Sequence, residues 1–206
     1  MTIHTPLPAA AVDPIHDHAL DRLFHEARTQ NGWLDRPVPE ALVREAVELA
    51  KIGPTSANVS PMRIALVTSP EAKARLKPAL AEGNVEKTMS APITAIVGYD
   101  LKFYDQLPKL FPHADARAWF VGNEAFANDT AYKNGTLQVA YFLLALRAVG
   151  LDTGPLSGFD NSKVDAEFFP GGNVKSNVII NIGYGDETKL FPRSPRLSFE
   201  EIAQVA

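Results

Sequence analysis

The chain of 206 residues contains no cysteine, so a disulfide, a thiolate nucleophile and a cysteine-ligated metal are all excluded. An excess of positive charge is also missing. The 20 Lys and Arg residues are outnumbered by 24 Asp and Glu residues, for a net charge of −4. Because nucleic-acid surfaces depend on clustered positive charge that faces phosphates, we expect no nucleic-acid partner.

Long apolar runs are absent as well. The longest run, Val139–Leu146, is far shorter than the roughly 20 residues that a membrane-spanning helix requires. Residues 1–11 lack the basic start and the apolar stretch of a signal peptide. These absences and the missing cysteines predict a cytoplasmic protein without a membrane partner.

Several common signatures of nucleotide binding and catalysis do not occur. There is no GxGxxG motif, and no Gly-Lys pair that would indicate a P-loop. Ser157 in "GPLSG" lacks the glycine two residues earlier that a nucleophile elbow requires. Four of the five histidines lie within the first 25 residues, two of them in "HDH", with no third ligand at a suitable spacing. No metal site is predicted.

Helical and strand-like patterns alternate along most of the chain, without a composition break that would mark a linker. Residues 1–16 are rich in proline and predict a flexible arm, and residues 17–206 predict a single layered domain of α and β elements. We expect helices near residues 17–27, 39–52, 70–82, 122–149 and 161–169, and strands near residues 63–69, 92–100 and 174–186. Residues 101–120 are aromatic and irregular, and residues 151–160 are expected to form a loop.

The stretch "GPTSANVSP", residues 53–61, is unusually rich in small polar groups for a simple turn. Such a segment allows a ligand to approach the backbone closely, although a helix stop followed by a cap would have a similar composition. Its candidate ligand contacts are Pro54, Thr55, Ser56, Asn58 and Ser60.

Three further segments carry hydrogen-bond donors. The phrase "ARTQNGW" contains Arg28, Thr29 and Asn31, and the tail phrase "RSPR" contains Arg193 and Arg196. A guanidinium beside a hydroxyl suits a phosphate. Asn84 and Lys87 in "EGNVEKT" share a face if the segment is helical, and their amide and ammonium suit a polar heteroaromatic ring. Each segment alone is equally typical of an exposed surface, so the hypothesis requires the fold to gather them.

The order and wording of these segments resemble the FMN-dependent nitroreductase family, over residues from about Leu20 to Ala203. Within the family, the chain is similar to the malonic semialdehyde reductases of the pyrimidine-utilisation (Rut) type. The shared phrases are "ARTQNGW", "GPTSANVSP", "GLDTGPLSGFD", "KSNVIINIGYGD" and "PRLSFEE". The resemblance implies an α+β fold, a three-layer sandwich with a mixed central sheet flanked by helices. It also implies an intertwined homodimer with FMN at each subunit interface and a C-terminal arm over the partner.

Site residues follow from the same resemblance. Arg28 and Thr29 match part of the phosphate site, which Arg193 or Arg196 completes, and the loop at residues 53–61 matches a segment that lies against the flavin. Asn84 and Lys87 match the residues near the flavin pyrimidine. The segment facing N5 of the ring is matched by Pro155, Leu156, Ser157 and Gly158.

The chain departs from many relatives at three positions of this pattern. Ala27 stands where they have the first of two arginines, Asn31 where they have Arg or Lys, and Ser157 where they have Glu. Positive charge near the phosphate is therefore reduced. Either the tail arginines compensate, or FMN binds less tightly. The Ser157 difference also puts the family's nicotinamide contacts in doubt.

The implied reaction passes a hydride from NADH or NADPH to FMN and then from N5 to malonic semialdehyde, giving 3-hydroxypropionate. The carbonyl oxygen needs a proton, for which Tyr104 and His113 are candidates, and Arg117 is a candidate partner of the substrate carboxylate. For these three residues, surface or packing roles are the alternative. Reduction of nitroarenes or quinones, flavin binding without catalysis, and a cofactor-free interaction protein remain alternatives. The sequence does not distinguish NADH from NADPH.

Overall fold

Four apolar segments pair into one sheet in the computed structural model, which describes residues 14–206. The strands are β1 (Met62–Val67), β2 (Ile93–Asp100), β3 (Asp152–Leu156) and β4 (Val174–Gly183), in the order β1-β2-β4-β3. The first six residues of β2 and the last five of β4 are buried, as expected for central strands that are covered on both faces. The predicted arm at residues 1–16 falls largely outside the described residues, and residues 14–16 are exposed without regular structure.

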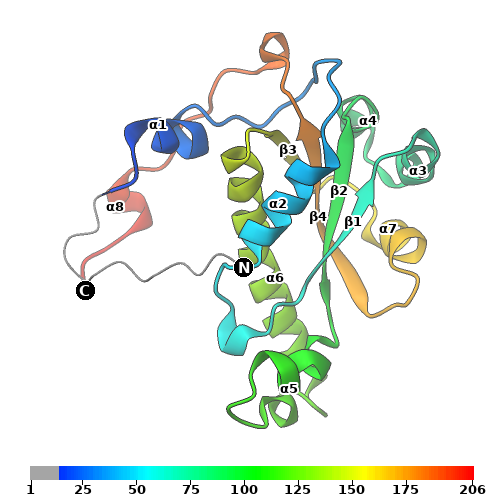
Figure 1. Ribbon diagram of the computed structural model, residues 1–206, viewed down its shortest axis with the longest axis vertical. Helices are drawn as coiled ribbons and strands as arrows, with labels where there is room; N and C mark the ends of the chain where they lie inside the picture. The colour runs from blue at the N-terminus through cyan, green and yellow to red at the C-terminus, as the bar shows by residue number, and fades with distance from the viewer. Residues whose placement is uncertain (1–13) are drawn as a thin grey trace.

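Helices cover both faces of this sheet (Figure 1). On one face lie α2 (Glu40–Ala50) and the long α6 (Glu124–Ala148), which pack on Ala95, Val97 and Ile180. The other face is covered by α3 (Pro70–Leu76), α4 (Glu82–Met89) and α7 (Asn161–Phe168). There, Leu76 and Val164 pack on Ile96 and Ile179. Because successive residues of a strand point to opposite faces, the sheet separates two apolar cores. The expected three-layer α+β sandwich is confirmed.

The expectation of a mixed sheet is wrong, because all three pairs of neighbouring strands are antiparallel. The connection between β1 and β2 contains two helices, α3 and α4, which return the chain to the end of the sheet where β1 finished. Val67 accordingly pairs with Thr94 at the start of β2. The strands β2 and β3 are parallel to each other, but β4 lies between them. A parallel pairing is found in the single bridge between Thr29 and Thr153.

The segment at residues 151–160 is not entirely a loop, because residues 152–156 form the edge strand β3. Pro155 and the preceding Gly154 had argued against a strand. Proline has no N–H to donate, but an edge strand pairs on one side only and tolerates it there. Pro155 lies opposite Ile180 of β4.

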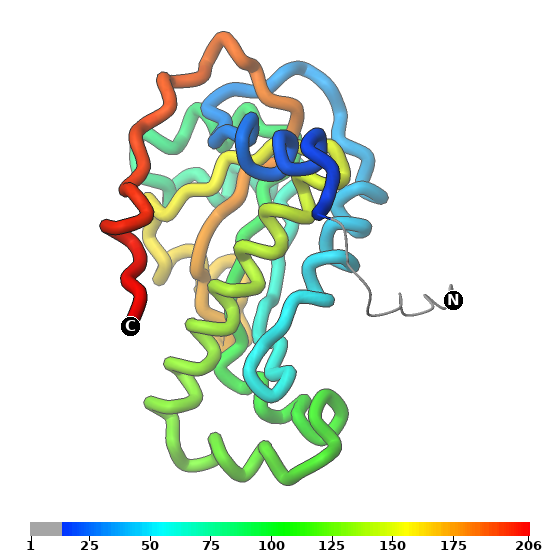
Figure 2. Tube along the Cα trace, turned by 90° about the vertical axis from the view of Figure 1, so that its left-hand side faces the viewer, coloured from blue at the N-terminus to red at the C-terminus, as the bar shows by residue number. Residues whose placement is uncertain are grey.

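Different segments of the chain lie near the two ends of α6 (Figures 1 and 2). Near its C-terminal end lie α1 (Asp17–Leu20) and the π-helical turn Asp21–His25, in which Arg22 donates to the carbonyl of Arg147. The segment that leads to α8 (Phe199–Ile202) passes the same region. At the opposite end lie the aromatic segment, with α5 (Leu107–Leu110), and the loop at residues 53–61.

A buried lysine holds the C-terminal end of α4. The side chain of Lys73 is 6% exposed, and its ammonium donates to the carbonyls of Thr88 (2.9 Å), Met89 (3.3 Å) and Ala91. These carbonyls would otherwise lack partners at the end of a helix. From the sheet, the Asn181 amide donates to the Thr88 hydroxyl at 3.0 Å. The end of α4 is therefore fixed against both α3 and β4.

Removing the Lys73 ammonium is expected to destabilise the fold. In Lys73→Met the side-chain length is kept, but three buried carbonyls lose their donor, which costs about 1–3 kcal/mol. Chemical denaturation measures this difference. The matched control is Lys77→Met, at an exposed position one turn along, which is expected to change little. Equal stabilities of the two variants would contradict this role of Lys73.

The same ammonium predicts a pH dependence. Burial lowers the pKa of Lys73 to about 8, from its usual 10.5. Between these values the unfolded chain binds more protons than the folded chain, so stability contributed by this group rises with pH. We expect the free energy of unfolding of the wild type, relative to Lys73→Met, to increase from pH 8 to pH 10.5. A flat or falling difference would show that the pKa is not lowered.

Candidate functional site

A pocket of about 500 Å³ gathers polar side chains from three distant parts of the chain. Its walls come from the segment after α1, the last turn of α6 and the C-terminal tail. It brings together all of the residues predicted from "ARTQNGW" and "RSPR", and one further arginine. The polar lining residues are Arg28, Thr29, Asn31, Arg147, Arg193, Ser194 and Arg196.

The edge strand β3 positions the first of these segments. Thr29 forms a parallel bridge with Thr153, and the backbone N–H of Gln30 donates to the Thr153 carbonyl at 3.0 Å. Gly154 permits this approach, because a Cβ atom there would lie 2.7 Å from the Gln30 carbonyl oxygen. The segment therefore extends the sheet by a short pairing and places Arg28 and Asn31 at the pocket.

Backbone carbonyls orient three of the guanidinium groups. Arg28 donates to the carbonyl of Phe191, and Arg193 donates to the carbonyls of His25 (2.7 Å) and Ala27 (3.1 Å). Arg196 donates to the Ser194 carbonyl at 2.9 Å. Carbonyls fix direction without neutralising charge. Within residues 14–206 no carboxylate forms an ion pair with these groups, so the pocket suits an anion such as a phosphate.

Arg147 was not predicted from the sequence. It lies in the last turn of α6, is half-buried and lines the pocket. Burial lowers the pKa of its guanidinium, the nearby Asp152 raises it, and Arg22 and Arg193 lower it further. The one signal in the sequence was a lone charge in the apolar stretch "VAYFLLALRAVG", which reads equally well as a helix end.

A second group of predicted residues meets beyond the far end of β3. The side-chain amide of Asn84 donates to the Gly158 carbonyl at 2.9 Å. A Cβ atom at Gly158 would lie 2.5 Å from that amide nitrogen, so only glycine allows this contact without displacement. Lys87 lies one turn along α4 and is half-buried, and its carbonyl accepts from the Trp33 indole at 2.8 Å. The structure thus places Asn84 beside the segment at residues 155–158, with Lys87 one turn along the same helix.

The strand β3 joins these two groups. Thr153 lies beside Thr29 at one end, and Gly158 contacts Asn84 at the other. Five residues of extended chain span about 17 Å. An elongated ligand with a phosphate at one end and a flat polar ring at the other matches this arrangement. FMN has this form, and the donors of the two groups fit it: guanidinium groups for the phosphate, and an amide and an ammonium for the ring.

The loop at residues 53–61 lies away from this pocket in the same chain. The backbone N–H of Ser56 donates to the side chain of Asn134, and that of Met62 donates to Gln138, both at 2.9 Å. Asn134 precedes Arg147 by 13 residues, which corresponds to about 20 Å along a helix. The pocket and the loop are therefore separated by about half of the 25-residue length of α6.

Unusual backbone angles mark the same loop. Ala57, Asn58 and Ser60 have φ values of 46°, 53° and 40°, in the left-handed region that non-glycine residues seldom adopt. Such strain persists only where surrounding contacts impose it, and it concentrates at functional sites. The side-chain amide of Asn58 donates to the Leu110 carbonyl at 2.9 Å, which joins the loop to the aromatic segment.

The three candidate catalytic residues belong to that aromatic segment. Tyr104 is buried against Phe103, and its hydroxyl accepts from the Lys102 ammonium at 2.9 Å. Arg117 is paired with Asp105 at 2.9 Å. His113 is exposed. Figure 2 shows the aromatic segment, like the loop, toward the end of α6 that lies opposite α1 and the C-terminal tail.

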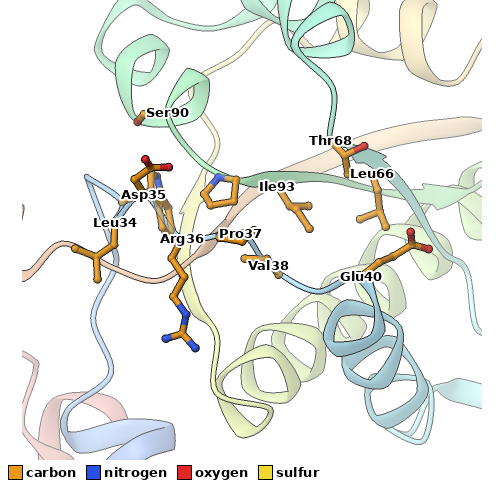
Figure 3. Close-up of a pocket in the computed structure, with 12 residues that line it drawn as sticks. Leu34, Asp35, Arg36, Pro37, Val38, Glu40, Leu66, Thr68, Ser90 and Ile93 are labelled. Atoms are coloured by element: carbon orange, nitrogen blue, oxygen red, sulfur yellow. The ribbon is translucent and has the colours of Figure 1, made fainter.

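A larger pocket lies elsewhere. It measures about 870 Å³ and lies between the segment at residues 33–40 and the free edge of β1 (Figure 3). Asp35, Arg36 and Glu40 give it charges of both signs, and Leu66 is an exposed apolar group of its wall. Because no predicted cofactor residue lines it, we regard it as a separate groove.

Two further features, a metal-binding cluster and a membrane-spanning helix, are absent from residues 14–206. No group of three or more His, Cys, Asp or Glu residues in that range is arranged to hold a metal ion. Over the same range, no helix combines the length and the apolar character that crossing a membrane requires.

Comparisons with known proteins agree with this architecture. A protein of Burkholderia lata, provisionally named an NADH dehydrogenase/NAD(P)H nitroreductase, is 59% identical over 191 residues, which are 93% of this chain and 98% of the relative. A nitroreductase family protein of Streptococcus pneumoniae superposes with a TM-score of 0.78 at 26% identity, covering 89% of this chain and 98% of that one.

A provisionally named nitroreductase of Exiguobacterium sibiricum, solved in complex with FMN, superposes with a TM-score of 0.80. It is 20% identical and covers 95% of this chain, with 98% of its own chain matched. Residues 26–184 match the model of the Nitroreductase family. The family resemblance of the sequence is thereby confirmed: this chain belongs to the nitroreductase family.

Proposed function

We propose that this chain is a cytoplasmic, FMN-dependent NAD(P)H oxidoreductase. The observation that carries the proposal is the alignment of two donor groups along β3, the arginine pocket at one end and Asn84 with Lys87 at the other. Arg28, Thr29 and the tail arginines would hold the phosphate. Asn84, Lys87 and residues 155–158 would hold the ring. The name of the Burkholderia lata relative and the FMN complex of the Exiguobacterium sibiricum neighbour support this choice.

Bound FMN would supply the hydride chemistry, taking a hydride from NAD(P)H and passing it to an acceptor. The chain's own groups tune that chemistry. Lys87 would place a positive charge near a ring that becomes negative on reduction, which would favour reduction. Gly158 leaves room for the Asn84 amide to reach its backbone carbonyl, and the exposed Ser157 precedes it at the surface.

We further propose a homodimer in which the loop at residues 53–61 of one protomer completes the flavin site of its partner. Leu137 and Tyr141 of α6 and Leu49 and Ile52 near the end of α2 are exposed large apolar groups, as at a subunit interface. A two-fold axis places the same patch on both protomers. It would also bring the strained loop of one copy to the arginine pocket of the other, which the loop cannot reach within its own chain.

For the acceptor we propose malonic semialdehyde, which would be reduced to 3-hydroxypropionate. This choice rests on the phrases shared with the Rut-type reductases, such as "GPTSANVSP". In the proposed dimer the aromatic segment accompanies the loop to the partner's flavin. His113 is exposed and is the accessible candidate for the proton donor. Tyr104 is buried and Arg117 already has a carboxylate partner, so packing roles are favoured for both. Nitroarenes, which the relative's name supports, and quinones are the second candidate class.

A spectrum followed by a substrate panel tests the activity. We expect purified protein loaded with FMN to be yellow and to lose its flavin absorbance when NADH or NADPH is added without oxygen. Turnover is then measured with small semialdehydes, nitroarenes and quinones. Turnover of nitroarenes or quinones alone would overturn the semialdehyde proposal. A yellow protein that neither nicotinamide reduces would indicate flavin binding without catalysis, and a protein that stays colourless with added FMN would contradict the whole proposal.

Complementation tests the shared site. Arg28→Glu introduces a negative charge in the pocket, and Ser56→Trp blocks the loop with a bulky group at an exposed position. Each homodimer is expected to lose activity. A heterodimer of the two variants, isolated with two affinity tags, contains one unaltered site and is expected to regain about half of the wild-type activity, because a two-fold dimer has two equivalent sites. A heterodimer as inactive as its parents would place each complete site within one chain.

A further inference from the structure

The helix α6 contributes a cation to the pocket that the N-terminal segment and the tail otherwise form. Arg147 lines this pocket with Arg28, Arg193 and Arg196. We propose that Arg147 binds the phosphate group of the flavin cofactor, as a residue of the binding site in addition to those of the two chain ends. The inference rests on the proposed function, since it concerns the same site.

Asp152, the carboxylate that stabilises the charge of Arg147, is shared with other groups. One oxygen of Asp152 lies 3.6 Å from the Arg22 guanidinium, and the other accepts from the Gly185 N–H at 2.9 Å. Arg147 itself donates to the Leu23 carbonyl at 3.3 Å. Among residues 14–206, Arg147 forms no ion pair. The nearest carboxylate thus serves Arg22, and the pocket keeps a net positive charge.

The position of Arg147 on a helix distinguishes it from the other cations. Arg28, Arg193 and Arg196 project from segments without regular structure. Arg147 lies in the last turn of a 25-residue helix, next to the fully buried Leu146. A side chain on a packed helix holds its position more closely than one on a loop, so less ordering is needed when a ligand binds.

Partial burial of Arg147 strengthens its attraction for an anion. Away from bulk water, opposite charges attract and like charges repel more strongly. Arg22 and Arg193 are close enough to lower the pKa of Arg147, so the pocket contains mutually repelling cations. A phosphate dianion would relieve this repulsion and accept hydrogen bonds from the free N–H groups of the guanidinium. Ala27 and Asn31 in "ARTQNGW" lack the positive charge that many relatives have there. Arg147 of α6 supplies positive charge to the pocket in addition to the tail arginines.

A purely structural role is the competing explanation. Arg147 joins α6 to the N-terminal segment, because its guanidinium donates to Leu23 and its carbonyl accepts from Arg22 at 3.1 Å. Loss of this contact between α6 and the N-terminal segment would disturb the binding of any flavin. Loss of a phosphate contact would affect FMN alone. Riboflavin, which has the same ring and chain but no phosphate, separates the two explanations.

The test measures dissociation constants for FMN and for riboflavin, by quenching of flavin fluorescence at low salt, in the wild type and in Arg147→Gln. We expect the affinity for FMN to fall about tenfold or more, as for loss of a hydrogen bond between charged groups, while the affinity for riboflavin stays within about twofold. The control Arg75→Gln removes an exposed arginine of α3 and is expected to leave both constants unchanged. Arg147→Lys keeps the charge but not the planar fork of donors, so a smaller loss of FMN preference is expected.

Equal losses of affinity for FMN and for riboflavin in Arg147→Gln would show that Arg147 acts by holding α6 to the N-terminal segment, and would overturn the inference. Unchanged constants would overturn it as well. If Arg147→Gln does not fold, Arg147→Lys decides the question, and an unaltered preference for FMN over riboflavin in that variant counts against a phosphate contact. A wild-type protein that binds neither flavin would remove the proposed function itself, which distinguishes that failure from the failure of this inference.

Discussion

The pairing of Thr29 with Thr153 is the contact on which the arrangement of the site depends. It attaches an irregular, polar segment to the edge of the sheet, next to the last turn of α6. The pairing is a single bridge, and it leaves Gln30 Oε1 and Thr153 Oγ1 buried without a hydrogen-bond partner among the described residues. Buried polar atoms without partners are costly, so the backbone hydrogen bond from Gln30 to Thr153 and the surrounding packing must offset that cost. The apolar layers of the sheet thus support a polar site at their margin.

At the other end of β3, the position of α4 is set by polar contacts. The ammonium of Lys73 binds the carbonyls at the end of this helix, and Asn181 binds both the Thr88 hydroxyl and, through its carbonyl oxygen, the Thr94 hydroxyl. A network of satisfied buried groups accepts one geometry and resists others. Asn84 and Lys87 are carried by the helix that this network holds. One margin of the site is therefore held by a single backbone bridge and the other by a network of side-chain hydrogen bonds.

The sequence predicted the elements of this fold better than their connections. Periodicity located α2, α6 and the apolar strands because each buries a regular face. The strand β3 was mistaken for a loop, since Pro155 has the local signature of a turn and its tolerance depends on being at a sheet edge. Strand direction also escaped prediction, because it depends on how helices return the chain rather than on any residue of the strand.

The candidate site residues also divide into those that the sequence predicted and those that it did not. The segments with Arg28 and Arg193 were singled out by their chemistry, and the fold brings them together. Arg147 carried no such signal, because its neighbours in sequence are apolar and its role depends on which chain ends pass the end of α6. The separation of the loop at residues 53–61 from the arginine pocket was equally hidden. It follows from the length of α6 in three dimensions, which the resemblance of individual phrases does not contain.

The amides of Asn134 and Gln138 replace strand partners for the backbone at Ser56 and Met62, on either side of the left-handed residues. The shape of the loop is thus encoded partly in a helix more than seventy positions later in the chain. Any chimaera that exchanges these nine residues with those of a homologue would have to transfer the two helical amides along with them. Evolutionary drift in one element constrains the substitutions that the other can accept.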